Sequence, residues 1–284
     1  MLHPPFIEYI KKRIKKYRFN KSLLLSPFVK IFWEEYYPKI NNPNLSREIT
    51  DSTLNEGEGR KWAIKFYNQR FKNFQDLEKQ KIGLISADKA YPIFRDIVSF
   101  IIENKLQEDR NLYLIQLGSC SGADLKFFYD TFPNLSFIST DVSDEILDFQ
   151  KEKYNFKNFD FFKTHAENIN DCFKKFNLYN KKVILFSRGS LQYVNPYFLE
   201  LFFSKLSAVR DLNLFICDTI DLDFLENQKK IKSNQRFDIV FNHRYEDYLS
   251  NSNKVIKNEI IKPFSEEDIN NFNIGLTYLH IRNS

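Results

Sequence analysis

The chain has 284 residues and a formal net charge of +5; 43% of its residues are hydrophobic and 17% are aromatic. This length provides one sizeable core with an appended subdomain and leaves little room for two full-sized domains. No apolar run approaches the roughly 18 residues of a membrane-spanning helix, and the first residues, MLHPPFIEYIKKR, lack an apolar signal segment. We therefore expect a soluble, cytoplasmic protein.

Three cysteines, Cys120, Cys172 and Cys217, lie far apart in the sequence and form no C-x-x-C pair. An odd number of isolated cysteines argues against a disulfide framework and against a zinc site. We expect three reduced thiols and no bound metal.

The first predicted element is a basic helix over Phe6–Phe19, with the sequence FIEYIKKRIKKYRF. Phe6, Ile10, Ile14 and Tyr17 recur near helical spacing, and Lys and Arg side chains surround them. Such a helix can contact an anionic membrane surface, a nucleic acid or an acidic substrate. We favour a helix that docks by its apolar stripe and keeps its charges in solvent; a transient membrane contact stays open, and we do not expect a nucleic acid.

Residues 1–105 have the pattern of helices that are broken at prolines and at the Asn41–Asn44 turn, without strand-like alternation. The segments PFVKIFWEEYYPKI and GRKWAIKFYNQRF carry aromatic residues at helical spacing, which is typical of a core face. Tyr91-Pro92 opens a long helix that runs to Lys105, because proline suits a first helical turn. We predict an N-terminal helical cap over residues 1–105.

A strand, a glycine loop and a helix follow. Leu112–Leu117 is an almost uninterrupted apolar run, as expected for a central parallel strand covered on both faces. Gly118 and Gly122 bracket small residues, so that backbone can approach a ligand there. A helix is predicted from Ala123, which directs the loop amides toward that ligand. We expect Gly122→Val to abolish binding without unfolding the protein.

The next predicted strand, Leu135–Thr140, leads into Asp141, roughly 20 residues after the loop. At this separation an acidic side chain accepts hydrogen bonds from ribose hydroxyls in a βαβ nucleotide-binding unit. Capping of the following helix is an equally open role for Asp141. The ribose interpretation predicts a nucleoside-cofactor site.

Strands and helices alternate from residue 106 onward, which predicts a parallel sheet with right-handed crossovers. Leu212–Asp218 is the fifth predicted strand. Lys254–Ile261 and Ile274–Ile281 are two late strand candidates. We assign residues 106–284 to one α/β domain.

The segment LIQLGSCSG resembles the first motif of the class I S-adenosylmethionine-dependent methyltransferases, an acidic residue followed by alternating glycines at the end of the first strand. Gln116 stands where the acid is usual, and Cys120 stands where the middle glycine is usual. Gln116 can still accept a hydrogen bond from the cofactor's amino group, but it brings no charge. A dinucleotide-binding fold is the weaker alternative, because its fingerprint is G-x-G-x-x-G.

Three later segments resemble the same family in the same order: STDVSDEIL, DFFKTHAEN and VILFSRGSLQYVNP. The resemblance implies a Rossmann-like, seven-stranded, mostly parallel sheet with an antiparallel final strand, and S-adenosyl-L-methionine as the cofactor. It also implies that Tyr91 or Arg95 meets the cofactor's carboxylate. The other cofactor-binding residues that it implies are Gln116, Gly118, Ser119, Gly122, Asp141, Val142, Ala166, Glu167, Ser187 and Arg188.

A sulfonium methyl group is already activated, so holding acceptor and methyl in line supplies most of the rate, with a general base for a hydroxyl acceptor. His243 and Tyr245 resemble the His-x-Tyr of some sugar- and small-molecule methyltransferases, at the start of their last long helix. The resemblance implies His243 as the catalytic base, since a neutral imidazole suits a hydroxyl, with Tyr193 and Tyr245 at the substrate. A packed or surface histidine is the competing interpretation.

The segment from Ser187 to Ser190 stands where methyltransferases of base amino groups carry Asn/Asp-Pro-Pro-aromatic, which disfavours base methylation. Arg188 occupies the place of the oxygen ligands that a metal-dependent mechanism needs, so we expect no metal. We predict a methyltransferase that acts on a small molecule or a glycan, with oxygen as the favoured acceptor atom. An RNA-directed enzyme that uses the basic helix, a non-catalytic partner that kept the fold, and the oligomeric state stay open.

Overall fold

The structure is a computed structural model that describes residues 92–237, 240–261 and 274–283. The basic helix Phe6–Phe19, most of the predicted cap, and Tyr91 lie outside the described residues. The boundary between the cap and the α/β domain therefore stays a prediction.

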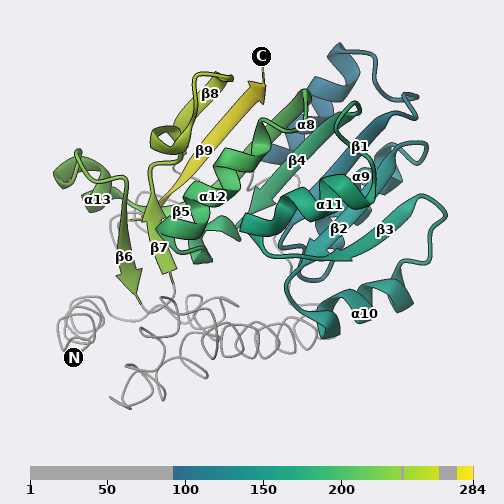
Figure 1. The fold of residues 1–284 in the computed structure, drawn as a ribbon, viewed down its shortest axis with the longest axis horizontal. Helices are drawn as coiled ribbons and strands as arrows, with labels where there is room; N and C mark the ends of the chain where they lie inside the picture. Colours follow the sequence, from purple (N-terminus) through teal and green to yellow (C-terminus); the bar gives the residue numbers. More distant parts are fainter. Residues whose placement is uncertain (1–91, 238–239, 262–273, 284) are drawn as a thin grey trace, which may run out of the picture.

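A seven-stranded sheet forms the centre of the described fold, in the order β3-β2-β1-β4-β5-β9-β8 (Figure 1). Strands β1 to β5 pair in parallel, and β9 is antiparallel to both of its neighbours. This order and the single reversed strand confirm the predicted Rossmann-like sheet. The strand bounds are Leu112–Leu117 (β1), Ser136–Asp141 (β2), Phe159–Lys163 (β3), Lys182–Arg188 (β4), Asp211–Asp221 (β5), Asn253–Ile261 (β8) and Ile274–Asn283 (β9).

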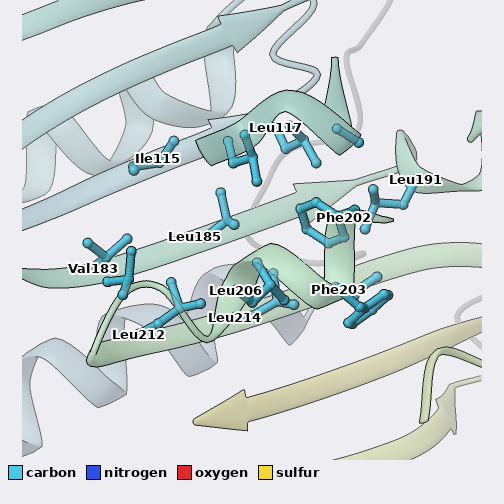
Figure 2. Packing of buried hydrophobic residues seen from close by; sticks show 14 of the residues in the cluster. Ile115, Leu117, Val183, Leu185, Leu191, Phe202, Phe203, Leu206, Leu212 and Leu214 are labelled. Atoms are coloured by element: carbon cyan, nitrogen blue, oxygen red, sulfur yellow. The ribbon is translucent and has the colours of Figure 1, made fainter. Parts of the chain in front are cut away.

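Helices cover both faces of the sheet. Helices α11 (Ile169–Lys175) and α12 (Pro196–Leu206) cross one face, in front of β4 and β5 in Figure 1. Figure 2 shows Phe202 and Leu206 of α12 among the leucines and valines of that face. Each such fully buried side chain contributes about 1.5–3 kcal/mol.

The opposite face packs against α8 (Pro92–Glu103) and α9 (Ala123–Thr131). Ile93, Phe94 and Ile97 of α8 lie in one buried cluster with Leu114 of β1 and Phe128 of α9. Helix α8 was predicted within the N-terminal cap, and in the structure it packs on the sheet. Within the described ranges, no helix has the length and apolar character that a bilayer span requires.

The remaining helices lie near the carboxyl ends of the strands. Helix α10 begins with Ser143 as its N-cap, whose hydroxyl accepts a hydrogen bond from the amide of Ile146. The bounds are Asp144–Lys153 (α10) and Leu222–Asn227 (α13) for the α-helices, and Ala166–Asn168 (η2), Leu191–Tyr193 (η3) and Tyr245–Tyr248 (η4) for the 3₁₀ turns.

A two-stranded hairpin follows β5 and was not predicted. Strands β6 (Ser233–Phe237) and β7 (Val240–His243) pair antiparallel, with a register shift between Gln235 and Phe237. His243 therefore ends a strand and is followed by the short η4 turn, whereas the resemblance placed it at the start of a long helix. The side chains of β7 are all buried, which explains why a strand forms there.

Candidate functional site

The loops after β1, β2 and β4 lie together at the carboxyl ends of these neighbouring strands. Leu117 of β1 pairs with Thr140 of β2 on one side and with Ser187 of β4 on the other. The crossover helix α9 packs on one face of the sheet, and α11, which leads into β4, packs on the other. This reversal beside β1 is the place where open α/β sheets bind ligands.

The loop after β1 depends on its glycines. Gly118 and Gly122 have φ angles of 69° and 73°, in the left-handed region. A Cβ at Gly118 would lie 2.4 Å from Ser190 Oγ, and one at Gly122 would lie 2.7 Å from the ring of Tyr154. The expectation that Gly122→Val spares the fold is therefore not supported, because valine would collide with the protein's own side chains.

Cys120 departs from the family motif, and its backbone explains why glycine suits this position. Its φ angle is 49°, so a non-glycine residue occupies a left-handed conformation here. The three cysteines are free thiols, and none forms a disulfide. Burial raises the pKa of the Cys172 thiol to about 12 and also raises that of Cys217.

Gln150 of α10 forms hydrogen bonds to two residues of the loop after β1, and the sequence did not predict this role. Its amide donates to Ser119 Oγ at 2.8 Å and to the Cys120 carbonyl at 2.6 Å, while Ser139 Oγ donates to its oxygen at 2.5 Å. Ser119 was predicted to bind the cofactor, but its buried hydroxyl is engaged within the protein. Its backbone is engaged as well, because its amide donates to the Thr140 carbonyl at 2.9 Å and its carbonyl accepts from the Gly122 amide at 2.8 Å.

Asp141 ends β2, as predicted, and its buried carboxylate faces the glycine loop. It accepts hydrogen bonds from the amides of Cys120 at 3.1 Å and Ser143 at 3.2 Å. Burial raises the pKa of Asp141 to about 6, although nearby amides, including those of Val142 and Ser119, act in the opposite direction. The carboxylate thus joins the ends of β1 and β2, and Ser143 rather than Asp141 caps the following helix.

The predicted adenine turn lies after β3. Ala166 is buried and opens η2, whereas Glu167 and Val142 are partly exposed. The structure places these residues beside the Asp141 end of β2, because the amide of Thr164 donates to the Asp141 carbonyl at 3.0 Å. Their contact with a nucleobase stays a prediction.

A charged cluster joins Gln116, Arg188 and a residue that sequence analysis missed, Asp124. Arg188 donates from Nε and Nη2 to the two oxygens of Asp124, each at 2.8 Å. The Gln116 amide donates to Asp124 Oδ2 at 3.0 Å. The Arg188 guanidinium also lies 5.5 Å from the ring centroid of Phe94. The signal for Asp124 was available: it is the acidic residue in the first turn of the helix after the loop.

Two other predicted cofactor residues are not part of this cluster. Ser187 is fully buried, and within the described part of the chain its hydroxyl has no hydrogen-bond partner. The Arg95 side chain is 72% exposed and donates to Asp96 at 3.2 Å, so the structure does not bring it to the loop.

On the other side of β4, a buried carboxylate that was not predicted holds the loop after the strand. Asp218 of β5 accepts a hydrogen bond from the Tyr245 hydroxyl at 2.5 Å. Burial raises the pKa of Asp218 to about 6, opposed by Tyr245 and by the amides of Ser190, Gly189 and Gln192. Tyr245, predicted at the substrate, is therefore a fully buried partner of this carboxylate.

Gln192, Thr219 and Arg236 continue the polar network. Arg236 Nη2 donates to Thr219 Oγ1 at 2.9 Å and to Gln192 Oε1 at 3.4 Å, and the Thr219 hydroxyl also donates to Gln192. Burial lowers the pKa of Arg236, while the nearby Tyr193 and Asp221 raise it. Arg236 was not predicted, because it lies in the unrecognised hairpin.

His243 is only 2% exposed at the end of β7. Its Nδ1 lies 2.6 Å from Ser233 Oγ, which in turn lies 2.5 Å from the Tyr248 hydroxyl. Burial lowers the pKa of His243 to about 3, and the backbone of Val194 and Leu191 opposes this. The imidazole is therefore neutral at ordinary pH, and its enclosure favours a packed, positioning histidine; the role of general base stays a prediction.

Metal binding has no candidate site in the described ranges, where no three His, Cys, Asp or Glu side chains gather closely enough to hold an ion. The cluster at Asp124 and the network at Asp218 are thus held by hydrogen bonds and ion pairs within the protein.

Comparison with known proteins gives matches in structure only. No family model matches the chain, and no curated protein is similar to it in sequence. Three similar solved structures are a protein provisionally named as a sarcosine dimethylglycine methyltransferase from Galdieria sulphuraria, and S-adenosylmethionine-dependent methyltransferases from Anabaena variabilis and Clostridium acetobutylicum.

The three are 11%, 13% and 14% identical to this chain, with TM-scores of 0.49, 0.48 and 0.48. They cover 67%, 69% and 74% of this chain, and 85%, 86% and 99% of their own. The fold assignment therefore rests on the strand order and strand directions of this chain.

Proposed function

We propose that this chain is an S-adenosylmethionine-dependent methyltransferase. The observation that carries the proposal is the junction at the ends of β1 and β2, where the Asp141 carboxylate meets the amide of Cys120 in the glycine loop. Four sequence segments with the order of the family, and a sheet with a single reversed strand, support it.

The residues present at this edge fit a nucleoside cofactor. Glycine at 118 and 122 permits the left-handed turns of the loop and its close packing on Ser190 and Tyr154, and Asp141 lies where it can accept hydrogen bonds from ribose hydroxyls. Val142, Ala166 and Glu167 would border the base. When bound, S-adenosyl-L-methionine supplies an electrophilic methyl group on a sulfonium.

The protein's part in the reaction is then to orient an acceptor against that methyl group and to exclude water. We assign the acceptor to the loop after β4, where Tyr193 is partly exposed and lies close enough to Arg236 to raise its pKa. We propose a small molecule or glycan as the acceptor and oxygen as the atom that is methylated.

The proposal also includes a general base, which a hydroxyl acceptor would need. His243 ends β7, which contacts the η3 turn in the loop after β4, but its Nδ1 is engaged with Ser233. The position of His243 near the loop after β4 supports a role as the general base, whereas its burial supports a positioning role. We propose to test these two roles separately.

A ligand comparison on the intact chain tests the proposal. We expect S-adenosylhomocysteine and S-adenosylmethionine to raise the melting temperature, because a ligand bound only by the folded state stabilises it. NAD at the same concentration should leave the melting temperature unchanged. A rise with NAD alone, or no rise with either sulfur nucleoside, would contradict the assignment.

A further inference from the structure

The cluster of Gln116, Asp124 and Arg188 lies at the rim of the glycine loop, on the face of the sheet that carries α8 and α9. Leu112 and Leu114 of β1 point to that face, and Gln116 continues their alternation. Asp124 lies in the first turn of α9, directly after the loop. The three side chains therefore flank the backbone that we propose to hold the cofactor.

The orientation of the Gln116 amide follows from its partner. A carboxylate only accepts hydrogen bonds, so the nitrogen of Gln116 must face Asp124, and the bond is 3.0 Å long. Gln116 Oε1 is then left buried, with no hydrogen-bond partner in the described part of the chain, and the residue is 2% exposed. An unpaired buried acceptor is unfavourable, and a bound donor would offset this cost.

Asp124 also retains capacity to accept. An ionised carboxylate offers about four lone-pair sites. Gln116 and Arg188 Nε use Oδ2, and Arg188 Nη2 uses Oδ1. Among these contacts, one acceptor site on Oδ1 therefore remains, on the carboxylate that the Gln116 amide contacts. The Asp124 side chain is 10% exposed and that of Arg188 is 30% exposed, so the cluster reaches the surface.

A ligand that matches these groups carries several N–H donors on one positively charged centre. A water molecule offers two donors and no charge, whereas an ammonium offers three and is attracted by the carboxylate. The adjacent Arg188 favours a negative group beside the ammonium. This combination is the zwitterionic end of an α-amino acid.

We propose that Asp124 and Gln116 Oε1 bind the α-ammonium of the cofactor's amino-acid end, and that Arg188 is the positioning residue that fixes the Asp124 carboxylate. The proposal rests on the proposed function, and it assigns the recognising charge to α9 rather than to β1. Asp124 is thus a binding residue that determines selectivity for a ligand with a free amino-acid end.

Two ligands separate this proposal from the proposed function. S-Adenosylhomocysteine carries the amino-acid end, and 5′-methylthioadenosine has the same nucleoside and thioether without it. In calorimetric titrations, the intact chain should bind S-adenosylhomocysteine at least about tenfold more tightly, as expected for charge-assisted bonds. Equal affinities would overturn the inference and leave the nucleoside site intact, whereas no binding of either ligand would overturn the proposed function itself.

Substitutions then identify the residues. Asp124→Asn should weaken binding of S-adenosylhomocysteine by roughly tenfold to a hundredfold and change that of 5′-methylthioadenosine by less than about twofold. Gln116→Glu added to Asp124→Asn returns a carboxylate to the cluster and should recover most of the loss. Asp130→Asn, which removes an exposed carboxylate from the same helix, is the matched control and should leave both affinities unchanged.

Three results would overturn the proposal: an equal loss for both ligands in Asp124→Asn, full affinity of that variant for S-adenosylhomocysteine, or no recovery in the double variant. Even if Asp124→Asn does not fold, equal affinities of the two ligands for the parent protein would overturn the proposal.

Discussion

The two sides of the candidate site are built from different kinds of group. In the loop after β1, backbone groups are direct partners: Asp141 accepts from the amides of Cys120 and Ser143, and Gln150 donates to the Cys120 carbonyl. Beyond β4, side chains bond to side chains, as in Tyr245 with Asp218. The loop after β1 depends on glycine residues, where a Cβ atom would collide with neighbouring side chains. The network beyond β4 depends on particular polar side chains, such as Asp218 and Tyr245.

This difference predicts which substitutions each side tolerates. The loop after β1 should be most sensitive to added volume at its glycines, whereas the network beyond β4 should be most sensitive to changes of its polar side chains.

Gly118→Ala should give the largest loss of stability. Gly118 and Gly189 both have φ angles of 69°, so alanine is strained at either position. A Cβ at Gly118 would lie 2.4 Å from Ser190 Oγ, but one at Gly189 would have its nearest neighbour at 3.8 Å. We expect Gly118→Ala to lose about 2–5 kcal/mol and Gly189→Ala about 1–2 kcal/mol in urea unfolding. Equal losses would show that backbone strain, rather than space, limits the loop.

Asp218→Asn should change how stability depends on pH. The pKa of Asp218 is raised to about 6, above its usual value, so the folded protein holds a proton that the unfolded chain has lost. Relative to Asp218→Asn, the parent should lose about 1–3 kcal/mol of unfolding free energy as the pH rises from about 4 to 6, and the difference should level off above about 7.

Unfolding free energies of both proteins across this range measure the effect. Tyr245→Phe provides a check, because it removes a hydrogen bond that lowers the pKa of Asp218 and should move the window to higher pH. A difference that does not vary with pH would mean that Asp218 titrates normally.

His243→Asn should have the smallest effect if His243 positions the loop after β4. Because burial lowers its pKa to about 3, the imidazole stays neutral between about pH 5 and 7, and no loss of turnover in that range should depend on His243. A positioning role predicts less than a tenfold loss of turnover, whereas a general base predicts roughly 10²–10⁴. Turnover against pH for parent and variant, with bound cofactor measured separately, distinguishes the two roles.

The sequence predicted the glycine loop and Asp141, but it did not predict the network beyond β4. The glycine loop and Asp141 lie within one short segment, and their backbone conformations depend on residues that are visible as a motif. Asp218 and Tyr245 are 27 residues apart, and Arg236 reaches Thr219 across 17 residues, so neither contact leaves a local pattern. The β6–β7 hairpin, which places His243 in a strand, was missed because its strands are short and β6 is largely polar. Gln150 and Asp124 were missed for the same reason, because Gln150 reaches Ser119 across 31 residues and Asp124 reaches Arg188 across 64.

The most direct test of the cofactor assignment is the dissociation constant of S-adenosylhomocysteine for the parent, Asp141→Asn and Asp144→Asn. Asp144 is the matched control, since it is an exposed carboxylate three residues away that pairs with Lys163. We predict that Asp141→Asn weakens binding by roughly tenfold to a hundredfold and that Asp144→Asn changes it by less than about twofold. Equal affinity of Asp141→Asn and the parent would contradict the ribose assignment, and binding of NAD in place of S-adenosylhomocysteine would contradict the proposed function.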